Sequence, residues 1–189
     1  MPTTISGWPV LDNPAWGDSR AKRAIIPELD VTLWVREEAW PLFAALVRDY
    51  NDMINHVSIL YSYDYRQARA ANAWSNHAGG VAVDINPDAE GARGTAWTNW
   101  WKTNRRNRRA QRIRKMYQIV NWGAWTEIAD DPHTTQIEGW SAGYADAMHW
   151  ELRAGTTVAD VQRVIKFLGI TPDGYRMNDA KGNPRRKIL

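Results

Sequence analysis

The sequence predicts an α+β domain in which a small antiparallel sheet is flanked by helices. Short runs of β-branched and aromatic residues predict the strands, and longer segments with apolar residues at helical spacing predict the helices. Strands mixed with separate helices are typical of this class. A chain of 189 residues with 44% hydrophobic content can bury one sizeable core, so we expect a single domain over 1–171.

The order of elements follows from local composition. Segment 1–30 is rich in Pro, Gly and Trp, which predicts an irregular wrap that packs on the domain. Helical periodicity predicts helices at 37–53, 104–120 and 157–168. Strands are predicted at 57–63, 80–86 and 147–152. After Pro172 the chain is polar, basic and rich in Gly and Asn, so we expect 172–189 to be a mobile tail.

Composition limits the chemistry that the chain can perform. It has no cysteine, which excludes a disulfide framework, a thiolate zinc site and a cysteine nucleophile. Any metal must therefore be bound through carboxylates and the four histidines. We expect most of the 12 tryptophans to lie in the core, because each brings a large apolar body.

Membrane and export signals are not recognised in the sequence. There is no apolar run long enough to span a bilayer, and the first residues have neither the basic nor the apolar region of a signal peptide. We therefore expect synthesis in the cytoplasm without an export signal. The net charge of +3, the pI near 9.3 and the clustered arginines predict attraction to a polyanion.

The strongest motif runs from Ser75 to Asp84 and reads S-x-H-x-x-G-x-A-x-D. Gly79 and Gly80 allow a sharp turn and, we expect, a close approach of the backbone to a metal. Ala82 and Asp84 share one face of the following strand because side chains alternate. The motif thus predicts that His77 and Asp84 point into one site, beside a small residue that leaves room for an ion.

A second motif begins at Asp146 and reads D-x-x-H-x-E. On a strand, Met148, Trp150 and Leu152 would face the core, and His149 and Glu151 the opposite side. Two histidines and one aspartate are a plausible ligand set for a catalytic zinc ion, with the fourth position left for water.

Together the two motifs resemble those of zinc peptidases that include D-alanyl-D-alanine carboxypeptidases, vancomycin-resistance D,D-dipeptidases and phage L-alanyl-D-glutamate endolysins. The resemblance covers most of the chain up to about residue 155 and includes the segments 7–10 and 120–125. It implies a fold like that of hedgehog and D,D-peptidase domains. It also implies Zn²⁺ as cofactor, with His77, Asp84 and His149 as metal ligands.

The resemblance assigns further residues to catalysis. Asp146 corresponds to the family's general base and acid, and Arg66, after Tyr65, to the arginine that contacts the scissile carbonyl; Arg69 is the alternative. Ser75 and Glu151 are expected to orient ligands or hold substrate. The implied reaction is hydrolysis of peptide bonds in peptidoglycan, and we expect a phage endolysin that reaches the cell wall after holin-mediated release.

The sequence is also compatible with several alternative functions. The same chemistry would serve a D,D-carboxypeptidase that removes terminal D-Ala. The Arg-rich segment 104–115 could bind anionic cell-wall polymers, or nucleic acid in a protein of another class. A non-catalytic zinc domain is a further alternative, which Asp146 argues against. We expect a monomer that does not bind nucleic acid.

Overall fold

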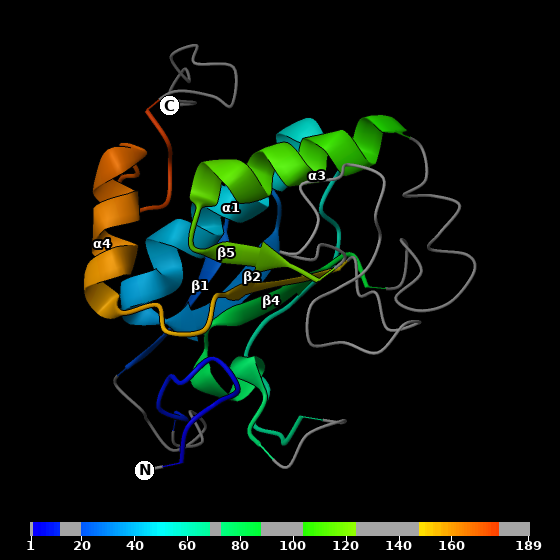
Figure 1. The fold of residues 1–189 in the computed structure, drawn as a ribbon. Helices are drawn as coiled ribbons and strands as arrows, with labels where there is room; N and C mark the ends of the chain where they lie inside the picture. Colours follow the sequence, from blue (N-terminus) through cyan, green and yellow to red (C-terminus); the bar gives the residue numbers. More distant parts are fainter. Residues whose placement is uncertain (1, 12–19, 69–72, 88–103, 124–147, 178–189) are drawn as a thin grey trace.

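The computed structural model describes residues 2–11, 20–68, 73–87, 104–123 and 148–177. In Figure 1 the strands lie at the centre, helix α3 runs along one side, and helix α4 lies at one end. The N-terminal segment and the short helix η3 lie on the side away from α3. Among the described helices, none combines the length and the apolar composition needed to cross a membrane.

A four-stranded antiparallel sheet forms the centre of the fold. Its strands are β3 (Leu60–Tyr61), β4 (Ala82–Ile85), β6 (His149–Leu152) and β5 (Val120–Trp122), and they lie in that order. The predicted class, α+β with a small antiparallel sheet flanked by helices, is confirmed at this level.

Alternation along β4 and β6 separates two faces of this sheet. Val83, Trp150 and Leu152 belong to the hydrophobic core. Trp150 stacks on Trp122, with ring centroids 5.8 Å apart. It also contacts Tyr50, in the helix Trp40–Met53, edge-on with ring centroids 6.2 Å apart. The residues between them in sequence point to the opposite face, because successive side chains alternate. The sheet therefore presents a packed apolar face and a separate polar face.

The helix predicted at 37–53 is confirmed as η2 (Glu37–Ala39) followed by α1 (Trp40–Met53). Pro41 lies in the first turn of α1, where its missing N–H is tolerated. The helix predicted at 104–120 is shorter, because α3 (Asn104–Tyr117) ends before Gln118, whose φ is +53°. The next residues form β5 and pair with β6, so the helix prediction is wrong beyond Tyr117.

Part of the predicted N-terminal wrap is a β-hairpin. Strand β1 (Ala21–Ile26) pairs antiparallel with β2 (Val31–Arg36). The turn ends at Asp30, which has a φ of +53°. Buried residues alternate along β2 at Val31, Leu33 and Val35. The prediction of an irregular segment is therefore wrong for β1. The alternation of apolar residues along β2 was the signal that could have revealed the hairpin.

The strand predicted at 57–63 is reduced to the two residues of β3. Before it, the Ser58 and Ile59 amides donate to the side-chain Oδ1 of Asn86 at 2.9 and 3.2 Å rather than to a strand. After it, the Oγ of Ser62 accepts from the Trp34 amide at 2.9 Å. On both sides of β3, hydrogen bonds to side chains thus replace the backbone hydrogen bonds of a longer strand.

The C-terminal helix α4 (Val158–Phe167) begins with a reciprocal capping box between Thr157 and Asp160. The chain beyond it returns to α1. Arg48 donates to the carbonyls of Asp173 and Gly174, both at 2.9 Å. Arg176 is buried and lies 3.1 Å from the buried carboxylate of Asp49.

These contacts concern the first residues of the segment that was expected to be a mobile tail. A mobile tail was expected to begin directly after residue 171, but two arginine contacts hold the following residues against α1. Residues up to Arg176 therefore pack against α1. The remainder of the expected tail, 178–189, lies outside the described residues.

Candidate metal centre

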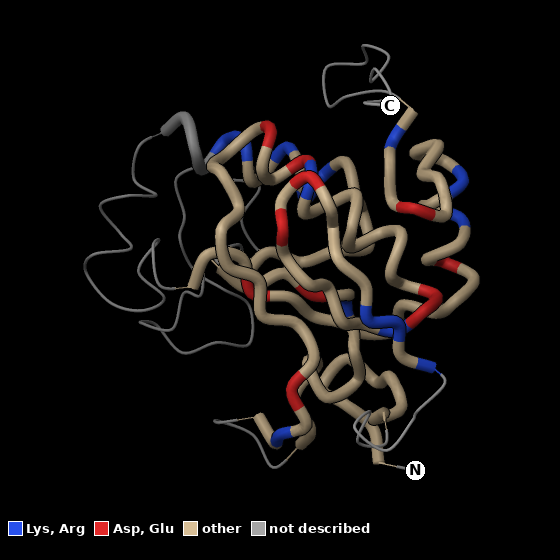
Figure 2. Tube along the Cα trace, turned by 180° about the vertical axis from the view of Figure 1, so that it is seen from behind, with Lys and Arg blue, Asp and Glu red and all other residues tan. Residues whose placement is uncertain are grey.

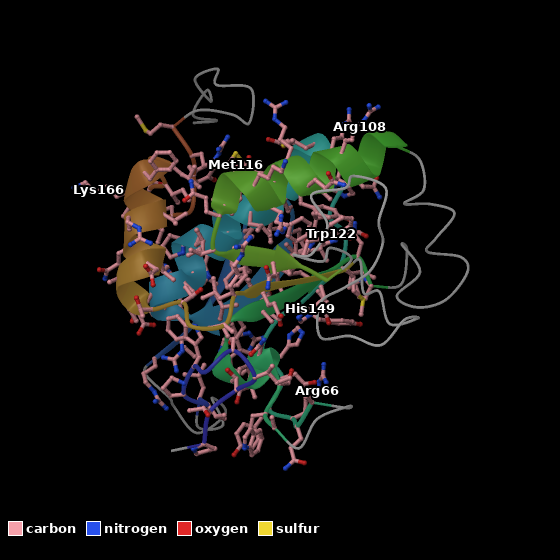
Figure 3. The ribbon with its side chains drawn as sticks, in the orientation of Figure 1. Arg66, Arg108, Met116, Trp122, His149 and Lys166 are labelled. Atoms are coloured by element: carbon pink, nitrogen blue, oxygen red, sulfur yellow. The ribbon has the colours of Figure 1, made fainter. Side chains whose placement is uncertain are left out.

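Three elements bring His77, Asp84 and His149 together on the polar face of the sheet. Asp84 on β4 is the direct cross-strand partner of His149 on β6. His77 lies on η3 (Asn76–Gly79), which leads directly into β4. All three residues are buried, and one potential ligand atom of each lies within 4.8 Å of the others. Figure 3 shows His149 below the sheet, on the side of η3.

The separations between these atoms suit a small metal ion. His149 Nδ1 lies 2.8 Å from Asp84 Oδ1, His77 Nε2 lies 3.3 Å from the same oxygen, and the two ring nitrogens are 3.2 Å apart. A tetrahedral zinc ion with bonds of ~2.0–2.1 Å holds its ligand atoms ~3.3 Å from each other. The residues therefore fit a three-ligand zinc centre without rearrangement of the backbone.

Hydrogen bonds on the outer side of each imidazole determine which nitrogen can bind a metal. The Nδ1–H of His77 donates to the carbonyl of Ser62, and the Nε2–H of His149 donates to Glu151 Oε2 at 2.8 Å. Carbonyl and carboxylate oxygens only accept, so the outer nitrogens carry the hydrogens. The inner nitrogens, Nε2 of His77 and Nδ1 of His149, are then available to a cation.

Electrostatics within the cluster favour its charged form. Burial by itself would raise the pKa of Asp84, but its hydrogen bonds to His149 and His77 outweigh burial and hold that pKa far below its usual value. Burial lowers the pKa of His149, yet the neighbouring carboxylates of Glu151 and Asp84 raise it well above its usual value. A raised pKa favours the protonated form of His149, so a cation that bound its imidazole would have to displace a proton.

The glycines of the first motif position η3 against the N-terminal half of the chain. Gly80 has a φ of +64°, and a Cβ there would lie 2.7 Å from the Arg36 amide nitrogen and 2.8 Å from Leu11. A Cβ on Gly79 would lie 2.7 Å from Thr4. The close neighbours of these glycines are therefore β2 and the N-terminal segment.

Ser75 and Arg66, both expected near the site, have partners in the structure. Ser75 is the N-cap of η3, and its Oγ accepts from the backbone amide of His77 at 3.3 Å. Arg66 forms an ion pair with Asp64, with Nε and Oδ2 2.5 Å apart. Figure 3 shows Arg66 on the same side of the sheet as His149, in the chain leading to η3.

Asp146 and Arg69 lie outside the described residues. His56 is an exposed histidine shortly after α1, and its Nδ1 lies 3.2 Å from Asn51 Oδ1.

The sequence reading missed two groups that surround the imidazoles. The carbonyl of Ser62 holds His77, and a backbone group leaves no signal in a side-chain motif. Asn76 occupies the variable position of the first motif, and its Nδ2 donates to Glu151 Oε2 at 2.5 Å. The position of Asn76 directly before His77 was the only sequence signal for this contact.

Fold and site together define an α+β protein with a candidate three-ligand metal centre on one face of an antiparallel sheet. A family model described as D-alanyl-D-alanine carboxypeptidase matches residues 68–136. Neither the curated proteins nor the solved structures give a match. The matched stretch contains His77 and Asp84 and ends before His149, which the tertiary structure adds to the same site. The match supports similarity to peptidases of that kind.

Proposed function

We propose that this protein is a zinc-dependent peptidase that hydrolyses peptide bonds in the stem peptides or cross-links of bacterial peptidoglycan. The observation that carries the proposal is the convergence of His77, Asp84 and His149, whose inner ring nitrogens and carboxylate oxygen face one another at separations suited to zinc. The family match over residues 68–136 supports the same class of enzyme from an independent comparison.

The proposed roles divide the reaction among a few residues. A zinc ion held by the three ligands would supply the Lewis acidity that allows water to attack a peptide carbonyl near neutral pH. Asp146 takes the proton from the attacking water and returns it to the leaving amine. Arg66, freed from Asp64, stabilises the negative charge that develops on the carbonyl oxygen.

Within this class we favour a phage endolysin that acts on the host cell wall. The support is the resemblance of segments 7–10 and 120–125 to phage members of the zinc peptidases. A second candidate is a D,D-carboxypeptidase that removes terminal D-Ala, because the description of the matching family names that activity.

Mass spectrometry of digested muropeptides distinguishes these candidates. Purified cross-linked and uncross-linked muropeptides are incubated with the zinc-loaded protein, with the chelated protein, and with chelated protein to which zinc is restored. An endolysin gives fragments cut within the stem peptide or cross-link, whereas a D,D-carboxypeptidase gives loss of a single D-Ala. Equal cleavage with and without chelator, or no cleavage of any muropeptide by a zinc-loaded protein, would contradict the proposal.

We also propose that α3 assists adhesion to anionic cell-wall polymers. Its exposed basic residues Arg108, Arg112 and Lys115 recur at spacings of four and three, which places them on one helix face. Figure 2 shows acidic positions among the basic ones along the same side of the molecule, so the expected attraction is modest.

Sedimentation with purified cell walls at low and high salt tests this contribution. Replacing Lys115 and Arg112 by Glu should weaken low-salt binding, while wild-type binding should fall as salt rises. Binding of duplex DNA that survives chelation and exceeds binding to walls would favour the nucleic-acid alternative instead.

A further inference from the structure

Glu151, which accepts from His149, is itself held by a second side chain. Asn76 Nδ2 donates to Glu151 Oε2 at 2.5 Å, and this oxygen is the same one that accepts from His149 Nε2 at 2.8 Å. Asn76 is buried and directly precedes His77 in η3. The short helix η3 therefore supplies the candidate ligand His77 and also Asn76, which contacts the carboxylate on the outer side of His149.

Asn76 is held in turn by the N-terminal segment. Its Oδ1 accepts from the Ser6 backbone amide at 3.0 Å and from the Ser6 hydroxyl at 2.7 Å. A backbone amide only donates, so this contact fixes which end of the Asn76 amide carries the oxygen. The NH₂ end must then face Glu151, where a carboxylate accepts from it.

Ser6 is anchored to the end of the central sheet. Its carbonyl accepts from the Gly155 amide at 3.2 Å, shortly after β6, and the preceding Ile5 amide donates to the Trp74 carbonyl at 3.0 Å. Ser6 itself is buried. The segment thus joins the two parts of the chain that carry the candidate ligands.

We infer that Asn76 is a positioning residue of the metal centre, linked to His149 through Glu151 and held by Ser6. The relay Ser6, Asn76, Glu151, His149 fixes the Glu151 carboxylate so that the imidazole keeps its Nε2–H outward and its Nδ1 toward the metal. The N-terminal segment is therefore part of the metal centre, although it supplies no ligand. This inference rests on the proposed zinc site.

Chemistry explains why such a relay matters. A carboxylate behind a metal-bound imidazole orients the ring and increases its basicity, and loss of such a partner costs ~10- to 100-fold in metal affinity. An unsupported carboxylate could rotate away from the ring or bind the metal itself. Asn76 prevents both by holding the oxygen that faces His149.

Zinc affinity in full-length variants, measured by competition with a chromophoric chelator, tests the relay. Glu151→Ala should lose ~10- to 100-fold in affinity and Asn76→Ala should lose several-fold, as expected for partners of a metal-bound histidine. The absorption spectrum of the Co²⁺-loaded protein should change in both variants. Asn51→Ala removes a comparable amide that contacts His56 and Val57 instead, and should leave affinity and spectrum unchanged.

Double-mutant cycles separate a relay from general loss of structure. If Asn76 acts through Glu151, Asn76→Ala should have little further effect in the Glu151→Ala background. Ser6→Ala should likewise lose its effect in the Asn76→Ala background. Additive effects in both cycles would overturn the inference.

Two further outcomes have separate meanings. If Asn76→Ala does not fold, Glu151→Gln decides the question: it keeps the shape but weakens acceptance, so unchanged zinc affinity and an unchanged Co²⁺ spectrum would overturn the relay. If the wild-type protein binds zinc and every relay variant has the same zinc affinity and Co²⁺ spectrum, the relay alone is overturned. Wild-type protein that binds no zinc would overturn the proposed function together with the relay.

Discussion

His149 Nδ1 lies 2.8 Å from Asp84 Oδ1, and the two residues are direct cross-strand partners in β6 and β4. Opposed residues of an antiparallel pair project to the same face, so the register of these strands alone places both candidate ligand atoms together. His77 completes the group from the helix that precedes β4.

The first prediction concerns the ligands themselves. His149→Ala should lower zinc affinity by more than ~100-fold, beyond the loss expected for an outer partner of a ligand. Isothermal titration calorimetry measures the affinity and the stoichiometry, which should be one zinc per wild-type chain. His56→Ala is the matched control, because it removes an exposed imidazole outside the cluster and should bind zinc like the wild type.

Zinc affinity should rise with pH. Glu151 and Asp84 raise the pKa of His149 above its usual value despite burial, so metal-free protein binds a proton where zinc would bind. Zinc must displace that proton, and affinity should increase by up to ~tenfold per pH unit below the raised pKa. Calorimetry in buffers of different ionisation enthalpy counts the protons released; an affinity that does not change between pH 6 and 8 would contradict the assignment.

Asp146→Asn should abolish muropeptide hydrolysis and leave zinc bound. Asparagine keeps the size of the side chain but cannot accept the proton from water. Hydrolysis rate and zinc content are measured on the same preparation. Retained hydrolysis would refute the role of Asp146, whereas simultaneous loss of zinc would show that Asp146 contributes to the metal centre instead.

Gly80→Ala should destabilise the fold by more than ~2 kcal/mol, because a left-handed backbone disfavours a side chain and the site is crowded. The new Cβ would lie 2.7 Å from the Arg36 amide nitrogen, a backbone atom that cannot rotate away. Gly155→Ala is the control: its φ is +76°, but nothing lies within 4 Å. Urea unfolding of both variants separates crowding from backbone strain, and equal losses would show that crowding is unimportant.

The contact between Glu28 and Arg48 should contribute to acid sensitivity. Burial would raise the pKa of Glu28, but the hydrogen bond and charge of Arg48 lower it below its usual value. A lowered pKa means that the contribution to stability is present above the unfolded-state pKa near 4.5 and is lost as the pH falls through the folded-state value. Between pH 5 and pH 3, the free energy of unfolding should therefore fall less in Glu28→Gln than in the wild type. Urea unfolding measures it at each pH.

Local patterns in the sequence revealed much of this arrangement. The alternation in the two motifs predicted that Ala82 and Asp84 share a face and that Trp150 and Leu152 point away from His149. Helical periodicity predicted α1 with its proline in the first turn. Both patterns depend on the geometry of a single strand or helix, so neighbouring residues suffice to establish them.

Where the local signal was weak or interrupted, the sequence reading failed. The hairpin of β1 and β2 lay within a segment dominated by Pro, Gly and Trp, and β5 directly followed a helix with continuing apolar residues. The contacts of Arg48 and Asp49 with the C-terminal segment join residues more than 120 positions apart, which no local pattern reveals.

By itself, the sequence determined which residue types could form a metal centre and on which face of each strand they lie. Only the tertiary structure decided that Asp84 pairs with His149 across 65 residues, which nitrogen of each imidazole faces inward, and that Asn76 and Ser6 support Glu151. The physical reason is that side-chain direction follows from local backbone geometry. Strand register and hydrogen-bond partners instead depend on which distant segments pack together.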